Sequence, residues 1–164
     1  MADAPGATPQ TPEHVVGAAI QDLAAARLGR GFLPLAGVLV IGVAELLVGG
    51  PRAVEALALV VGAPLAGGAM LAHGMRIVQE AFGRAPRPWM AAASLGTLVP
   101  PAFGVYVFAW RGLREIAIGA GVGAVLLGVL SAALGLWALG TWMKLNELIR
   151  LARVMTWSGV DRMG

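Results

Sequence analysis

The sequence predicts an all-α integral membrane protein, and three observations support this. Hydrophobic residues make up 58% of the 164-residue chain and charged residues only 13%, about half the charged share of a typical soluble protein. A soluble domain of this size cannot bury so much apolar surface. The apolar residues also gather in four nearly uncharged runs, three of them close to the roughly 20 residues that a helix needs to cross a bilayer and the fourth longer. We therefore expect an antiparallel bundle of four transmembrane helices with an amphipathic helix at each end.

The excess of basic over acidic residues fits a membrane protein better than a nucleic-acid-binding protein. The net charge is +3 and the pI is about 10.6. However, only 12 residues are Lys or Arg, and they lie at the ends of apolar runs rather than in one patch. We therefore expect the lipid bilayer as a partner and no nucleic acid. The chain has no cysteine, which excludes disulfides and thiolate metal sites.

The N-terminal region is the most polar part of the chain. Residues 1–10 are small and polar and contain proline, so we expect them to be disordered. Thr11 then begins a Thr-Pro-Glu sequence, which is typical of a helix N-terminus. Apolar residues follow at helical spacing as far as Gly29 and Gly31, which predicts an amphipathic helix over 11–30. This helix is too short and too polar to span, so we expect it on the membrane surface or against the bundle.

The four predicted spans are separated by segments rich in Gly, Pro and charged residues, which are typical of turns. We expect two outer turns, at Gly49–Arg52 and Arg111–Glu115, and an inner loop around Pro86. The last span is expected to continue into an amphipathic C-terminal helix and tail over 144–164. The spans cover about 32–48, 53–75, 89–110 and 116–143, within a transmembrane domain over 31–143.

The distribution of basic residues predicts the orientation. With four spans, both termini lie on one side of the membrane. Nine of the 12 Lys and Arg residues fall on that side, and the other three are Arg52, Arg111 and Arg114. Basic residues concentrate in cytoplasmic loops. We therefore expect a multi-pass protein of a bacterial inner (cytoplasmic) membrane with both termini in the cytoplasm.

The last predicted span carries a face of small residues. In lipid, close backbone approach and dispersion hold helices together, because the hydrophobic effect is absent. The pattern therefore indicates a tight helix contact. The contact is either within this bundle, which is the simpler interpretation, or with another protein. The face consists of Ala120, Ala124, Gly128 and Ala132, spaced four apart, with Gly119 and Gly123 as an offset pair.

Three polar residues are candidates for a site. Glu45 lies inside the first span, where a carboxylate costs roughly 2.5–3.5 kcal/mol at the helix centre and often marks an ion pathway. Because Glu45 is only about 6 Å from the outer turn at 1.5 Å per residue, pairing with Arg52 is the simpler interpretation. His73 lies near the inner end of the second span, and a metal site there lacks further ligands. We expect a hydrogen-bonded or interface-facing histidine.

Prolines interrupt two adjacent spans. Pro64 and the pair Pro100 and Pro101 fall near the middle of the membrane if the predicted boundaries hold. Two broken helices at one depth are typical of transporters. Proline is nevertheless frequent in membrane helices, and only four spans are available. Kinks that shape helix packing are therefore the simpler interpretation.

The sequence predicts neither an enzyme nor a cofactor. The serines have no base in a recognisable arrangement, and the Gly-rich stretch at 119–123 lies inside a lipid-length apolar run without the context of a phosphate loop. A lipid-modifying enzyme is therefore the weakest hypothesis. The favoured hypothesis is a structural or accessory component of a membrane assembly, which packs against other subunits or a second copy of itself. The alternative is a small homo-oligomeric transporter in which Glu45 and the proline-broken spans line a path.

Overall fold

The computed structural model describes residues 12–49, 52–82, 84, 87–89, 96–119 and 121–160. All regular secondary structure within these ranges is helical, as expected. The expected disorder of residues 1–10 lies outside them. The elements are α1 (Pro12–Val48), α2 (Ala53–Ala81), the 3-10 turn η1 (Gly96–Leu98), α4 (Val99–Val105), the π-helix η2 (Tyr106–Leu113), α5 (Arg114–Ile118) and α6 (Val122–Val160).

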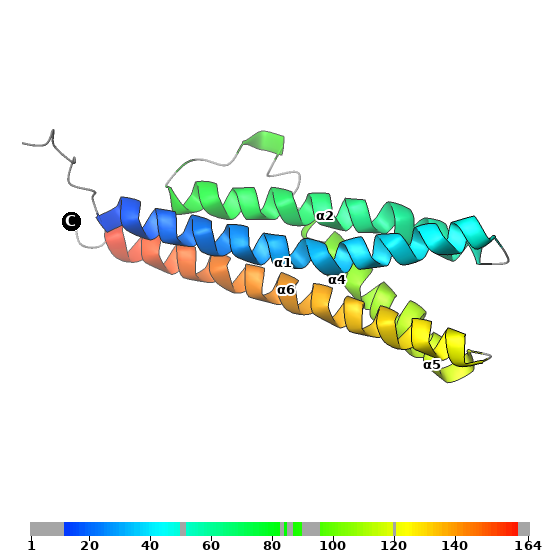
Figure 1. Ribbon diagram of the computed structural model, residues 1–164. Coiled ribbons are helices and arrows are strands. Elements are labelled where there is room, and N and C mark those ends of the chain that lie inside the picture. Colours follow the sequence, from blue (N-terminus) through cyan, green and yellow to red (C-terminus); the bar gives the residue numbers. More distant parts are fainter. Residues whose placement is uncertain are drawn as a thin grey trace, which may run out of the picture.

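Among the described residues, three helices are long and apolar enough to cross a membrane, over Gly17–Val48, Ala53–Ala81 and Val122–Leu148. They belong to α1, α2 and α6, which are elongated and run along one another (Figure 1). The start of α1 and the end of α6 meet at one end of the molecule, which we name the terminal end. The connections after α1 and α5 lie at the opposite end, which we name the turn end.

The first two predicted elements form a single helix. The sequence predicts a surface helix ending near Gly29 or Gly31 and a separate span over 32–48, but α1 continues from Pro12 to Val48 without a break. Gly31 is buried, and its missing side chain leaves room for Met70 and Thr141 from neighbouring helices. The glycine therefore permits close packing instead of ending the helix.

The third predicted span overlaps a helical run that ends later in the chain than predicted. The sequence predicts a span over 89–110 with a proline pair at its centre, whereas the described helical run covers 96–118. Pro100 and Pro101 occupy the first turn of α4, where proline suits the helix because no hydrogen bond is lost. They therefore start a helix instead of breaking one. Pro64 lies inside α2, which is helical on both sides of it.

The second outer turn also lies later than predicted. The segment Arg111–Glu115 is helical, because it forms the end of η2 and the start of α5. The connection to α6 falls instead at 119–121, where Gly121 has φ +95°, a conformation that residues with a side chain rarely adopt. Consequently α6 begins at Val122 rather than at 116. It runs on to Val160, so the predicted C-terminal amphipathic segment continues the same helix.

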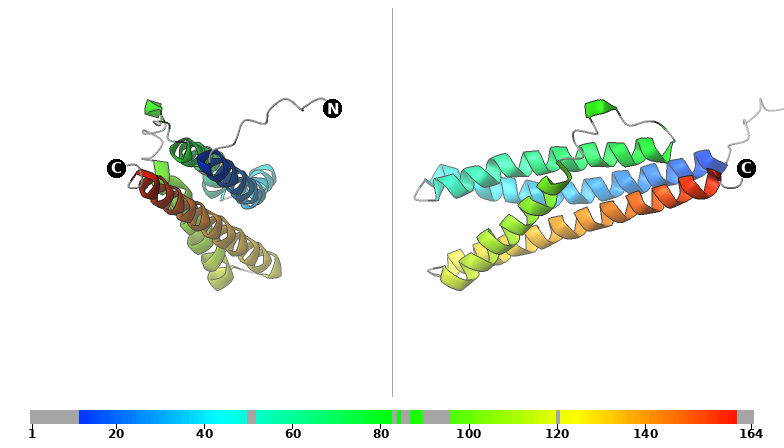
Figure 2. Two further views of the ribbon diagram at one scale, coloured as in Figure 1. Left: turned by 90° about the vertical axis from the view of Figure 1, so that its left-hand side faces the viewer. Right: turned by 180° about the vertical axis from the view of Figure 1, so that it is seen from behind.

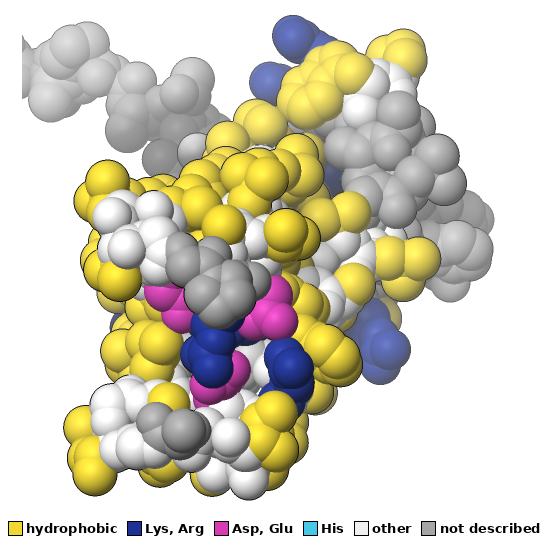
Figure 3. Space-filling model, turned by 90° about the vertical axis from the view of Figure 1, so that its right-hand side faces the viewer, with side chains coloured by type: hydrophobic (Ala, Val, Ile, Leu, Met, Phe, Trp, Pro, Cys, Tyr) yellow, Lys and Arg dark blue, Asp and Glu magenta, His cyan; other side chains and the backbone are white. Residues whose placement is uncertain are grey.

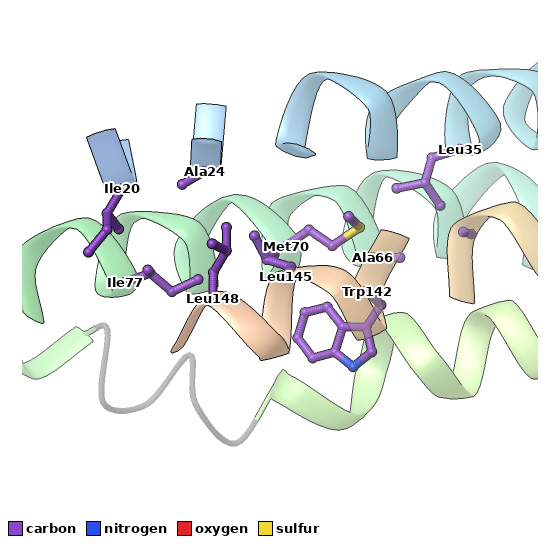
Figure 4. Packing of buried hydrophobic residues seen from close by; sticks show 10 residues of the cluster. Ile20, Ala24, Leu35, Ala66, Met70, Ile77, Trp142, Leu145 and Leu148 are labelled. Atoms are coloured by element: carbon purple, nitrogen blue, oxygen red, sulfur yellow. The ribbon is translucent and has the colours of Figure 1, made fainter. Parts of the chain in front are cut away.

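Two apolar clusters fill the space between the helices. The larger cluster joins α1, α2 and α6 in the half toward the terminal end (Figure 4), and includes Ile20, Met70, Ile77, Trp142 and Leu145. The second cluster joins α1, α2 and η2 and is formed by Val38, Ile41, Leu59, Ala63 and Val107. Figure 2 shows that α4, η2 and α5 run beside α6 toward the turn end.

Candidate functional site

Six charged side chains gather at the turn end, between the α1–α2 connection and the α5–α6 connection (Figure 3). Three carboxylates and three guanidinium groups take part, so their charges cancel. Four of the six come from segments that the sequence analysis treated as turns or interface. We name this group the ionic cluster. It consists of Glu45, Arg52, Glu55, Arg111, Arg114 and Glu115.

Arg111 is the centre of the ionic cluster. Its side chain is only 1% exposed, and its guanidinium group contacts carboxylates from three helices. Nη1 donates to Oε2 of Glu55 at 2.7 Å and lies 3.8 Å from Oε1 of Glu115, while Nη2 donates to Oε1 of Glu45. A guanidinium group suits this position because it is always charged and carries five donors in a planar fork.

Two further arginines close the ionic cluster at its periphery. Nη1 of Arg52 donates to Oε2 of Glu115 at 2.9 Å, and Nη1 of Arg114 donates to Oε1 of Glu55 at 3.0 Å. Both arginine side chains are partly exposed, at 47% and 39%. Arg114 also lies over the ring of Trp110, 4.7 Å from its centroid. The ionic cluster therefore cross-links the α1–α2 hairpin to the α5–α6 hairpin.

The π-helix explains how the segment before α6 keeps one face on that helix. In an α-helix of 3.6 residues per turn, positions four apart drift by about 40° at each step. The i→i+5 hydrogen bonds of a π-helix widen the turn and counter this drift. Phe108, Gly112 and Ile116, spaced four apart, therefore all contact α6. The face with Arg111 and Glu115 remains directed at α1 and α2.

Small residues bring the backbone of α6 into contact with the backbone of η2 and α5. A Cβ placed on Gly135 is 2.6 Å from the backbone nitrogen of Phe108, and one placed on Gly112 is 2.6 Å from the Cβ of Ala132. A Cβ on Gly128 is 2.9 Å from the Cβ of Glu115. We name these contacts of α6 with η2 and α5 the glycine seam. Gly128 and Ala132 of the predicted small-residue face thus pack within this chain.

The other members of the predicted face do not share this packing. Gly119 precedes α6, because it lies in the connection after α5, where its neighbour is Ala124. Gly123 is exposed, and a Cβ placed on it has no atom within 4 Å. Ala120 lies outside the described residues. The sequence analysis missed Gly112 and Gly135, which contact backbone, because their spacing does not match the four-residue repeat.

The predicted polar residues belong to two separate places. Glu45 and Arg52 both join the ionic cluster, but they bind different partners instead of each other. His73 lies in the terminal half and is 7% exposed. Its Nε2 is 3.0 Å from Oδ1 of Asn146, and its ring centroid is 4.7 Å from that of Trp142. His73 therefore helps to join α2 to α6.

Arginines engage all three carboxylates of the ionic cluster. Each carboxylate is within ion-pair distance of a guanidinium group, so none of the three is presented to a substrate as a free base. In the part of the chain that the structure describes, no group of three or more His, Asp or Glu side chains is arranged to hold a metal ion. No protein-family model matches the chain, and no curated protein or solved structure is significantly similar to it.

Proposed function

We propose that the chain is a structural or accessory subunit of a larger assembly in a bacterial inner membrane, where it packs its helices against those of another subunit. The ionic cluster and the glycine seam hold the chain itself together, so their residues are not available to a partner or to a transport path. A surface for a partner therefore has to lie elsewhere. The candidate is the part of α1 and α6 that extends beyond their uncharged stretches.

The charged residues indicate which part of the molecule lies in hydrocarbon. The 20 residues between Glu55 and Arg76 on α2, and residues 122–143 of α6, carry no charge. At 1.5 Å per residue these stretches are about 30 Å long, which matches the thickness of a bilayer core. Arg27 of α1 donates to the carbonyl oxygen of Lys144 on α6, so these two residues lie at the same level. The parts of α1 and α6 beyond them project outside the hydrocarbon.

The observation that carries the proposal is the apolar surface of this projection. We name residues 12–26 of α1 and 145–160 of α6 the stem. One face of the stem is buried in the larger apolar cluster. Among the other described side chains of the stem, four large apolar ones are about half exposed or more. In water, a continuous apolar surface marks an interaction site, and we propose that these side chains belong to one. They are Val15, Leu23, Leu151 and Val154, exposed by 52%, 48%, 52% and 66%.

We expect Leu23→Glu combined with Val154→Glu to release the chain from its assembly. Both side chains are exposed, so the substitutions leave the core intact while placing two charges on the apolar surface of the stem. Native mass spectrometry after gentle solubilisation should show the complex for the wild type and the free chain for the variant. Gln21→Glu, at an exposed position on α1, is the control and should retain the complex. A wild-type chain that is monomeric, or a complex unaffected by the double substitution, contradicts the proposal.

A four-pass topology with both termini in the cytoplasm belongs to the same proposal. Phe82, just after α2, lies against Gly17 near the terminal end, whereas Glu115 is bound to Arg52 at the turn end. The chain between Phe82 and Glu115 has to return along the length of the molecule. We therefore assign the run of α4, η2 and α5 to a third crossing in sequence order, which makes α6 the fourth.

Cysteine labelling tests this topology, because the chain has no cysteine of its own. Val48→Cys and Val122→Cys place exposed thiols at the turn end, and Arg84→Cys places one after α2. A membrane-impermeant maleimide should label the first two in intact spheroplasts and the third only after lysis. Labelling of Arg84→Cys in intact spheroplasts contradicts the orientation. Different accessibility of the Val48 and Val122 positions contradicts the four-pass topology.

The transport hypothesis stays a prediction, and the residues that suggested it have other surroundings than it requires. Glu45 is held by Arg111, and Pro64 and Pro100 do not break two helices at a shared depth. Liposomes containing the purified protein separate the two functions. Transport requires a proton or ion flux that disappears in Glu45→Gln, whereas the proposed accessory role predicts no flux in either protein.

A further inference from the structure

A pocket of about 450 Å³ opens between α1 and α6 at the level where their uncharged parts end. Its lining includes Arg27, Arg30, Trp137, Gly140, Lys144 and Glu147. The bond from Arg27 to the Lys144 carbonyl oxygen joins its two walls. A Cβ placed on Gly140 has no atom within 4 Å, so α6 leaves this space open.

The charge of the pocket differs from that of the ionic cluster. Three basic side chains face one carboxylate, that of Glu147, which leaves an excess of two positive charges. Within the described part of the chain, neither Arg30 nor Lys144 has an ion-pair partner. The ionic cluster, by contrast, is neutral and its arginines are paired. The pocket therefore has the charge and the donors to bind an anion.

The surroundings of the pocket resemble those of a lipid headgroup. Trp137 is 48% exposed, and tryptophan is enriched at the level of the headgroups. On the hydrocarbon side of the pocket, Leu33 of α1 and Leu136 of α6 are exposed by 59% and 53%. Basic pockets between transmembrane helices on the cytoplasmic side suit acidic headgroups, because a phosphate is held by the cations while the acyl chains lie along apolar helix faces.

We propose that this pocket binds the phosphate of an anionic phospholipid. Arg30 and Lys144 hold the phosphate from opposite walls, Arg27 holds the walls together, and the acyl chains run along α1 and α6 past Leu33 and Leu136. The inference depends on the position of these helices in a membrane and is independent of the accessory role. If the stem substitutions do not release a complex, the accessory role is contradicted but the lipid-binding inference is not.

The test uses purified full-length protein in mild detergent, titrated with phosphatidylglycerol or phosphatidylcholine and analysed by native mass spectrometry. We expect one tightly retained phosphatidylglycerol and no comparable retention of phosphatidylcholine. Arg30→Gln combined with Lys144→Gln should weaken retention about thirtyfold, from the roughly fivefold that each basic residue contributes near an anionic surface. Arg27 is unchanged, so the bond between the walls remains. The control is Arg84→Gln with Arg87→Gln, which removes the same charge at exposed positions outside the pocket and should bind like the wild type.

Competition distinguishes a lipid from a free phosphate. Inorganic phosphate and glycerol 3-phosphate carry the same anion without acyl chains, and they should displace the lipid only at far higher concentration. Equal binding of the two lipids, or equal binding by the pocket variant and the wild type, overturns the proposal. Displacement by inorganic phosphate at a concentration similar to that of the lipid also overturns it, because the pocket is then a site for a soluble anion.

Discussion

Replacing Arg111 with Met should lower the free energy of unfolding by about 3–5 kcal/mol, the cost of breaking a buried ion pair by removing one partner. The guanidinium group of Arg111 donates a hydrogen bond to the carboxylate of Glu45, and the Arg111 side chain is 1% exposed. Without it, the Glu45 carboxylate stays in a poorly solvated position with no cation, and only the two peripheral ion pairs, Arg52 with Glu115 and Arg114 with Glu55, still join the two hairpins. Unfolding of the purified protein in mixed micelles by increasing SDS measures the change.

Matched variants show whether the effect comes from a buried charge. Arg52→Gln and Arg114→Gln remove arginines that are 47% and 39% exposed, so each should cost less than about 1 kcal/mol. Adding Glu45→Gln to Arg111→Met removes the unpaired carboxylate and should restore much of the lost stability, since an ion pair replaced as a whole is often nearly neutral. If Arg111→Met costs no more than Arg52→Gln, the central role of Arg111 is wrong.

Gly135→Leu is expected to have the next largest effect. A Cβ at this position is already 2.6 Å from the backbone nitrogen of Phe108, so a leucine has to separate α6 from η2. Overpacking of a close contact costs about 1–3 kcal/mol, and here it also weakens the neighbouring contact of Gly112 with Ala132. The same SDS titration should show a clear shift of the unfolding midpoint to lower SDS.

The matched control is Gly123→Leu on the same helix. Gly123 is exposed and a Cβ on it meets no atom within 4 Å, so leucine adds helix propensity, up to about 1 kcal/mol, without a clash. The two variants should therefore move the unfolding midpoint in opposite directions. A similar midpoint for both variants shows that the glycine seam does not hold α6 in place.

The features that lipid imposes could be predicted from the sequence. Hydrocarbon requires long uncharged helices, and α2 and α6 have them. The local breaker signals were less reliable, because tertiary contacts decide what a glycine or proline does. Gly31 accommodates Met70 and Thr141 inside a continuous helix, and Pro100 starts a helix.

The ionic cluster was missed because its members are far apart in sequence. Arg111, Gly112 and Glu115 look like a turn when only neighbouring residues are considered. Glu45 and Glu55, the partners of Arg111, lie more than 50 residues away, and no local sequence pattern predicts the pairing. The spacing of Arg111 and Glu115, four apart, was the available signal for a helix. The small-residue face likewise predicted a tight contact, but which helix it contacts depends on where α5 ends and α6 begins.

The unbroken length of α1 has a mechanical consequence. A single helix joins Val15, on the cytoplasmic stem in the proposed orientation, to Glu45 beside Arg111, over about 45 Å at 1.5 Å per residue. If the helix tilts as one body about its cytoplasmic end, a tilt of about five degrees displaces the far end by about 4 Å. A displacement of this size away from Arg111 takes Glu45 out of ion-pair distance. In the proposed orientation, a partner that tilts α1 from the cytoplasm therefore shifts Glu45 in the ionic cluster on the opposite side of the membrane.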